Sequence, residues 1–196
     1  MCKLKSAIIL KDKIFMPDYD SHSEMLNELG IKDDYLGASK KFVRAELSPI
    51  DDDVFSDVDG WQFKVDQDIT PEWFSEEEYK PKMVDAVKEW AKTHIHIGVN
   101  GLKIESGQNH YIKNCKDAEI YGNATVKYIC GSATVENICD SATVISSPYT
   151  KWRNANSVIL SDNATFKDIY GKVIYQAGNY KLISVESGTK IKGGKQ

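Results

Sequence analysis

The sequence contains few of the features that mark an enzyme or a membrane protein on inspection. No stretch approaches the roughly 18 apolar residues that a membrane span needs, and the apolar run near the N-terminus is shorter than a signal-peptide core. No Ser/His/Asp or Cys/His arrangement, phosphate-cradling glycine loop or zinc-ligand spacing is present. We therefore expect a cytoplasmic protein with no catalytic activity and no cofactor.

The sequence has too little cysteine for a disulfide-bonded framework and too little positive charge for a protein that binds nucleic acid directly. The four cysteines, Cys2, Cys115, Cys130 and Cys139, include no Cys-x-x-Cys pair, which argues against a disulfide framework. The net charge of −4 argues against nucleic acid as a direct ligand, because contact with many phosphates requires a basic surface. The 196 residues are 41% hydrophobic and 28% charged, as in an ordinary globular protein with one large domain or two small ones.

A nine-residue phrase that repeats in the second half is the most informative feature that is present. It occupies residues 122–130 and 131–139, continues at 140–144 and returns at 162–170, each time around Ala-Thr-Val or Ala-Thr-Phe. A fixed period is typical of stacked units that bury their apolar side against their neighbours. Ala and Val share one strand face, and the isoleucine three residues after Val indicates a bend before the next corner.

The repeat fits either a flat meander or a coil, and we favour the coil. A meander keeps strict alternation and needs a second layer, whereas a coil closes its apolar face on itself. Two nonapeptides make about one 18-residue turn of a two-sided β-solenoid, as in the calcium rolls. The glycine-rich calcium pattern of those rolls is absent, so we expect no calcium here.

The first half follows the rules of mixed α/β structure. Apolar runs at residues 6–10 and 13–16 predict a hairpin, and alternating residues at 41–47 and 61–65 predict two further strands. Capping boxes at Ser21 and Ser75 predict helix starts. One helical stripe from Pro81 onward is formed by Met83, Val84, Val87, Trp90, Ala91 and Ile95.

These patterns predict an α+β head domain at residues 1–98, followed by a short β-solenoid, similar to a parallel β-helix, at residues 99–187. The 22 residues from Ala142 to Ala164 exceed one coil by about four, which predicts a loop insertion at 147–153. The end of the solenoid is expected to cap the open coil, since terminal repeats must. Residues 188–196 are rich in Gly and Lys and are expected to form a flexible tail.

Two segments are candidates for contact with a partner. The insertion contains Tyr149, Lys151, Trp152 and Arg153, residue types that are enriched at binding hot spots, although Trp152 could instead fold back over a coil edge. The second segment is acidic and is either a solvated loop, a cation site or a face that docks on a basic partner such as a nucleic-acid-binding enzyme. Seven aspartates crowd this stretch, Asp51, Asp52, Asp53, Asp57, Asp59, Asp66 and Asp68, and the first five are the candidates for contact with a partner.

His94 and His96 are weak candidates for metal binding. They alternate with isoleucines, so a strand would place both imidazoles on one side, and only the distant Glu105 and His110 could complete a site. We expect outward-facing strand histidines and no metal.

Several segments together resemble a family of uncharacterised proteins from phages and gut Firmicutes. They lie at residues 2–12, 17–22, 42–47, 65–69 and 87–92, and members of the family carry a similar N-terminal domain before variable numbers of Ser-Ala-Thr-Val nonapeptides. The resemblance covers nearly the whole chain and brings no activity, ligand or catalytic residue. It implies a phage or mobile-element accessory protein, for which inhibition of a host defence system, in the manner of an anti-CRISPR protein, is a reasonable expectation.

The sequence therefore predicts a non-catalytic binding protein that occludes or sequesters a host protein or a small-molecule ligand, away from the membrane. Two alternatives remain open. One is a metal-dependent enzyme that uses His94 and His96 with nearby carboxylates. The other is a structural protein that forms homo-oligomers through open solenoid ends.

Overall fold

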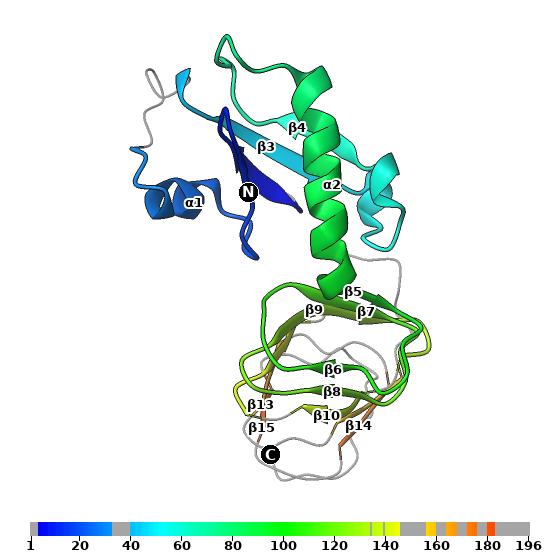
Figure 1. Ribbon diagram of the computed structural model, residues 1–196. Coiled ribbons are helices and arrows are strands. Elements are labelled where there is room, and N and C mark those ends of the chain that lie inside the picture. The colour runs from blue at the N-terminus through cyan, green and yellow to red at the C-terminus, as the bar shows by residue number, and fades with distance from the viewer. Residues whose placement is uncertain are drawn as a thin grey trace. The chain divides into compact units, whose positions relative to one another are not determined.

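The computed structural model describes residues 4–32, 40–133, 135–138 and 140–145, together with the backbone of four later strands at 156–159, 164–167, 172–175 and 180–182. The chain divides into two compact units, residues 1–92 and residues 93–196 (Figure 1). Within the described residues the fold is mixed α/β, with two α-helices and several sheets. The insertion at 147–153 and the tail at 188–196 lie outside the described residues.

The first unit is built on a four-stranded antiparallel sheet with the order β2-β1-β3-β4. Its strands are β1 (Ser6–Ile9), β2 (Ile14–Phe15), β3 (Val43–Ser48) and β4 (Gln62–Val65). The predicted hairpin is confirmed, because Ile8 pairs with Phe15 and Ile9 with Ile14. The two predicted strands near 41–47 and 61–65 are confirmed as β3 and β4, which pair with each other.

Both helices begin where the sequence provides a start signal. Helix α1 (His22–Glu28) follows Ser21, whose hydroxyl accepts a hydrogen bond from the Glu24 amide at 3.4 Å, as the predicted capping box requires. Helix α2 (Glu76–His94) begins directly after Ser75 and continues through Pro81. Its buried side is formed by Tyr79, Met83, Val87 and Trp90.

A few polar contacts join separate elements of the first unit. The Tyr79 hydroxyl donates to the Lys11 carbonyl at 2.8 Å, which ties α2 to the turn between β1 and β2. Lys5 is fully buried, lies 3.1 Å from an Asp20 carboxylate oxygen and sits over the Trp90 ring. On the sheet, Ile8 packs with Met25 and Leu26 of α1.

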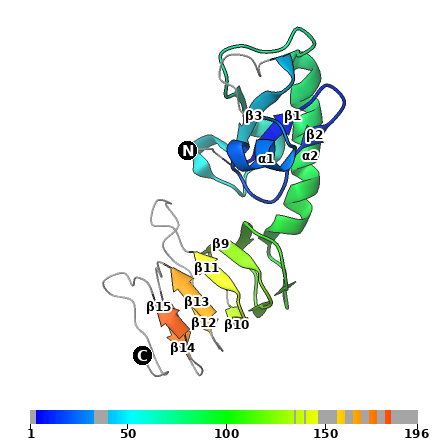
Figure 2. The same ribbon diagram turned by 90° about the vertical axis from the view of Figure 1, so that its left-hand side faces the viewer.

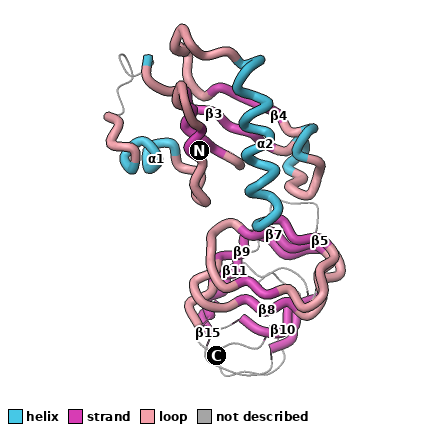
Figure 3. The backbone as a smooth tube through the Cα atoms, viewed as in Figure 1, coloured by secondary structure: helices cyan, strands magenta, loops and turns pink. Residues whose placement is uncertain are grey.

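In the described part of the second unit, short strands alternate with loops and turns (Figure 3), and the strands pair in parallel. Odd-numbered strands form a six-stranded sheet of order β15-β13-β11-β9-β7-β5, shown in part in Figure 2. Even-numbered strands form the sheets β10-β8-β6 and β12-β14. The strands are β5 (Ile95–Ile97), β6 (Lys103–Ile104), β7 (His110–Lys113), β8 (Ala118–Ile120), β9 (Thr125–Cys130), β10 (Val135–Ile138), β11 (Thr143–Ile145), β12 (Asn156–Ile159), β13 (Ala164–Lys167), β14 (Lys172–Tyr175) and β15 (Tyr180–Leu182).

Strand register in the six-stranded sheet follows the repeat. Thr143 pairs with Thr125, eighteen positions earlier, and with Thr165, 22 positions later. Two side chains repeat the same spacing at the corners: Asn114 accepts from the Ser132 amide at 2.9 Å, and Asp140 accepts from the Gly122 amide at 3.0 Å. Equivalent residues of every second nonapeptide therefore lie beside each other.

The alanine, valine and isoleucine positions of the repeat form the core of the second unit. Ala124, Val126, Ala142 and Val144 belong to one buried cluster with residues of the preceding strands. Cys115 and Cys130 are buried free thiols, and a buried free cysteine packs as a small apolar residue. In the described part of the chain, neither helix combines the length and apolar character that crossing a membrane requires.

Candidate functional site

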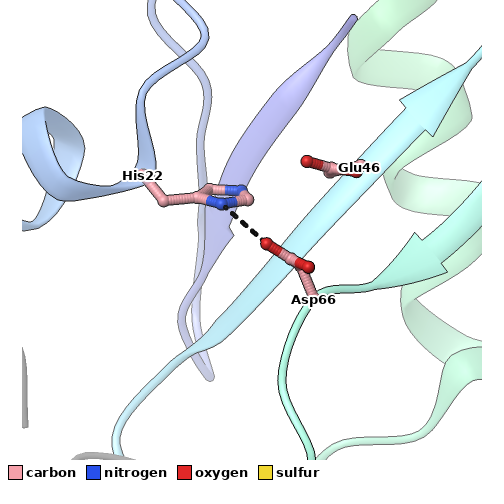
Figure 4. A group of neighbouring side chains, drawn as sticks. All are labelled: His22, Glu46 and Asp66. Carbon is pink, nitrogen blue, oxygen red and sulfur yellow. Dashed lines mark ion pairs between the residues drawn. The ribbon is translucent and has the colours of Figure 1, made fainter. Parts of the chain in front are cut away.

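Three side chains of the first unit that are far apart in the sequence meet at one point (Figure 4). His22 is the first residue of α1, Glu46 lies in the middle of β3, and Asp66 follows the last residue of β4. One nitrogen or oxygen atom from each lies within 4.8 Å of the other two. Among the described residues, this is the group of His, Cys, Asp and Glu side chains whose geometry suits a metal ion.

The group is buried at one end and open at the other. His22 is 4% exposed and Glu46 is 3% exposed, whereas the Asp66 side chain is 42% exposed. Lys64 lies at the open end, with its ammonium 3.5 Å from an Asp66 oxygen. A charged Glu46 in this position requires a compensating positive partner, because burial of a carboxylate otherwise costs several kcal/mol.

The two ring nitrogens of His22 face different groups. Nε2 lies 3.2 Å from the Ala45 carbonyl oxygen, which only accepts hydrogen bonds, so Nε2 carries a proton. Nδ1 lies 3.7 Å from an Asp66 oxygen and turns its lone pair or its second proton toward the carboxylates. A histidine that donates one N–H to a backbone carbonyl has its tautomer and ring orientation fixed, as is usual for histidines that bind metals.

Sequence reasoning included Asp66 in the acidic cluster but missed its grouping with His22 and Glu46. Pairing of β3 with β4 brings Ala45 opposite Val65 and Glu46 opposite Lys64, and so carries Asp66 to the Glu46 side. One signal was available in the strand itself, because Glu46 stands between Ala45 and Leu47, both fully buried. An acid within a buried run of a strand is uncommon and indicates a paired or metal-binding carboxylate.

The predicted metal candidates lie in the second unit and have a different arrangement. His94 is the last residue of α2 and is buried, so its expected place on a strand is wrong. His96 lies in β5 and is partly buried. His110, which is distant in the sequence, lies in β7 and contacts both His94 and His96. The His110 ring stacks on His94 with centroids 4.8 Å apart and on His96 at 5.5 Å.

This histidine stack, His94, His96 and His110, is held by hydrogen bonds. His96 Nε2 lies 3.3 Å from His110 Nδ1, and the other His110 nitrogen lies 2.9 Å from the Ser106 carbonyl oxygen. Burial, together with the neighbouring His110 and His94, lowers the pKa of His96 to about 4. The three rings are nearly parallel, so their nitrogens lie in separate planes. Among the described residues, His94, His96 and His110 do not form a group that could hold one metal ion. Glu105 is exposed.

The five candidate aspartates lie on one acidic segment, residues 50–59. Asp53 accepts a hydrogen bond from the Phe55 amide and Asp57 from the Asp59 amide, both at 3.1 Å, and Asp59 forms an ion pair with Lys88 at 2.6 Å. These three carboxylates therefore stabilise the segment. Asp51 and Asp52 are exposed in a 3-10 turn (Ile50–Asp52), and both have φ of 57°.

Tyr149, Lys151, Trp152 and Arg153 lie outside the described residues, so their predicted contact with a partner stays a prediction. The chain matches no protein-family model, no curated protein and no solved structure.

Proposed function

We propose that the protein is a non-catalytic binding protein that occludes a basic surface of a host protein, with the acidic segment 50–59 as its main contact. One observation carries the proposal. Ile50 is 61% exposed and is followed directly by the exposed Asp51 and Asp52. A single exposed apolar residue is ordinary, but here it stands beside two outward carboxylates on a fixed backbone. Such a surface fits a basic partner that offers a small apolar depression.

The acidic segment is preorganised for contact. Asp51 and Asp52 adopt left-handed conformations that residues other than glycine seldom adopt, and such conformations persist where the surrounding structure holds them. Ser56 donates to the Asp53 carbonyl at 2.7 Å, and the Trp61 indole donates to the Ser56 hydroxyl at 3.1 Å. A loop that is already ordered loses little conformational entropy on binding, which favours affinity.

The charge of the segment indicates the chemistry of the partner. Aspartates on one turn steer a basic surface into contact and raise the association rate. Proteins that bind nucleic acid present such basic surfaces, and occupying one would block its normal ligand. The resemblance to phage and Firmicutes proteins supports a defence effector of this kind as the target, and Tyr149–Arg153 is proposed as a second contact.

We further propose that the second unit is a β-solenoid that serves as a rigid scaffold. The alternation of odd and even strands between parallel sheets supports it, as does the pairing of Thr143 with Thr125 eighteen positions earlier. In a coil, each turn contributes one strand to each sheet and contacts only its neighbours.

The binding function is tested by capture from a Firmicutes lysate with the tagged full-length chain. The variant Ile50→Ser/Asp51→Asn/Asp52→Asn removes the apolar and charged parts of the contact. The control Asp68→Asn/Ile69→Ser alters an adjacent acid and isoleucine elsewhere on the first unit, where Ile69 is 60% exposed. We expect the wild type and the control to retain the same basic protein, and the variant to lose about tenfold or more in affinity.

Equal capture by both variants would show that the acidic segment is not the contact. Recovery of no protein by the wild type would contradict the binding function itself. Once the partner is purified, association rates at two salt concentrations provide a second check, because the wild type should slow with added salt more than the variant.

A further inference from the structure

We propose that His22, Glu46 and Asp66 bind one divalent transition metal ion of the zinc class in the first unit. This site is separate from the acidic segment and from the candidate histidines that the sequence suggests. It combines one imidazole nitrogen with two carboxylate oxygens, all within 4.8 Å of one another, which is close enough for a single ion to contact all three.

The charge of the group suits a divalent metal ion. With His22 neutral, Glu46 and Asp66 carry two negative charges, which one divalent cation balances. A protonated His22 balances only one of them, and Lys64 lies at the exposed end, where its 60% exposed side chain is well solvated. Glu46 is only 3% exposed, so water screens its charge little and a divalent cation beside it is stabilising.

The position of the His22 ring supports the same assignment. Its Nε2 proton is donated to the Ala45 carbonyl at 3.2 Å, so in the neutral ring the lone pair is on Nδ1, the nitrogen that faces Asp66. This is the tautomer that a metal at the centre of the three side chains requires. The ring is also buried, which limits its rotation away from the site.

The ligand set indicates the class of metal and leaves one side open. Imidazole nitrogen with carboxylate oxygen suits Zn²⁺ and its transition-metal neighbours, whereas Ca²⁺ and Mg²⁺ prefer oxygen ligands alone. Three protein ligands leave a fourth position of a tetrahedral ion for water. The exposed Asp66 side chain places that position at the surface and gives the ion a path to enter.

The test is calorimetric titration of the full-length chain, freed of metal with a chelator, using Zn²⁺ alone. Titrations with Mg²⁺ and with Ca²⁺ alone establish the metal class. We expect one equivalent of Zn²⁺ to bind, and Asp66→Asn to weaken binding by about tenfold or more. Asp68→Asn, which makes the same charge change on an exposed residue two positions later, should bind Zn²⁺ as the wild type does.

Two further variants locate the ion. Glu46→Gln should also weaken Zn²⁺ binding, and it is used only after its circular dichroism spectrum proves native, since Glu46 is buried. Asp66→Asn alters an exposed side chain and decides the matter by itself. The proposal is overturned if Zn²⁺ does not bind, if Asp66→Asn binds as tightly as Asp68→Asn, or if only His110→Gln abolishes binding. Stronger binding of Ca²⁺ or Mg²⁺ than of Zn²⁺ would overturn the metal class.

Discussion

At the scale of single residues, glycines at the corners of the second unit differ sharply in what surrounds them. Gly101 and Gly122 have nearly the same left-handed backbone, with φ of +63° and +64°. A Cβ added at Gly101 would meet nothing within 4 Å, whereas at Gly122 it would lie 2.2 Å from the Glu105 carbonyl oxygen. Gly122 is therefore required by its backbone angle and by the close approach of the Glu105 backbone.

This difference yields a prediction with a built-in control. Gly101→Ala should cost about 1–2 kcal/mol, the strain of a left-handed alanine. Gly122→Ala carries the same strain and must also displace the Glu105 backbone, which adds about 1–3 kcal/mol. Urea unfolding followed by circular dichroism measures both losses. Equal losses for the two variants would show that the Glu105 backbone does not pack closely against Gly122.

The histidine stack predicts a dependence of stability on pH. Burial, His110 and His94 lower the pKa of His96 to about 4 in the folded chain, from an ordinary value of 6.5. The unfolded chain therefore binds a proton more readily between these two values, so stability falls as pH is lowered from about 6.5 towards 4. The full shift would correspond to about 3 kcal/mol. Partial exposure of the ring reduces the expected loss to ~1–2 kcal/mol.

Nuclear magnetic resonance of the imidazole ring gives the direct measurement. The His96 signals should titrate with a midpoint near 4, and His110→Gln should move that midpoint upward by removing one of the neighbouring groups that lowers the pKa. His96→Asn should make the stability of the second unit less dependent on pH between 4 and 6.5. A His96 midpoint near 6.5 in the wild type would contradict the stacked arrangement.

At the scale of elements, local sequence signals were sufficient to predict a helix or hairpin whose stabilising contacts are between residues close in the sequence. Ser21 and the Glu24 amide are three residues apart, so the cap of α1 can be read from the sequence. The hairpin of β1 and β2 is closed by the Leu10 amide and the Lys13 carbonyl, at 2.8 Å. Helix α2 begins before Pro81, because the signals at Ser75 and in the later stripe belong to one helix.

The sequence was insufficient where the structure depends on pairing between residues that are far apart in the chain. His22, Glu46 and Asp66 are separated by 24 and 20 positions, and only the register of β3 against β4 brings two of them together. His94 was also misplaced, because its alternation with isoleucines suggests a strand although helix α2 continues through it. Neither arrangement leaves a spacing that a local pattern could detect.

At the scale of the whole molecule, the two units are stabilised by different kinds of contact. The first unit depends on single long-range contacts, such as the buried Lys5 with Asp20 and the pairing of β1 with β3. The second unit repeats one kind of contact between neighbouring strands, at a spacing of about two nonapeptides, as when Ile138 pairs with Ile120. Loss of one contact should therefore disrupt the first unit broadly and the second unit locally.

Removal of whole repeats tests the proposed coil. Deletion of residues 123–140 takes out eighteen residues and joins Gly122 to Ser141, so that the phrase Gly-Ser-Ala-Thr-Val is preserved and every later strand stays in its own sheet. Deletion of residues 132–140 takes out nine residues, preserves the same phrase at Gly131 and moves every later strand to the opposite sheet. If each turn contributes one strand to each sheet, the eighteen-residue deletion should destabilise the chain less than the nine-residue deletion.

Thermal unfolding by circular dichroism should show a cooperative transition for the eighteen-residue deletion and a lower midpoint for the nine-residue deletion. The opposite order would exclude a coil of two nonapeptides per turn, since a meander loses fewer contacts when fewer residues are removed.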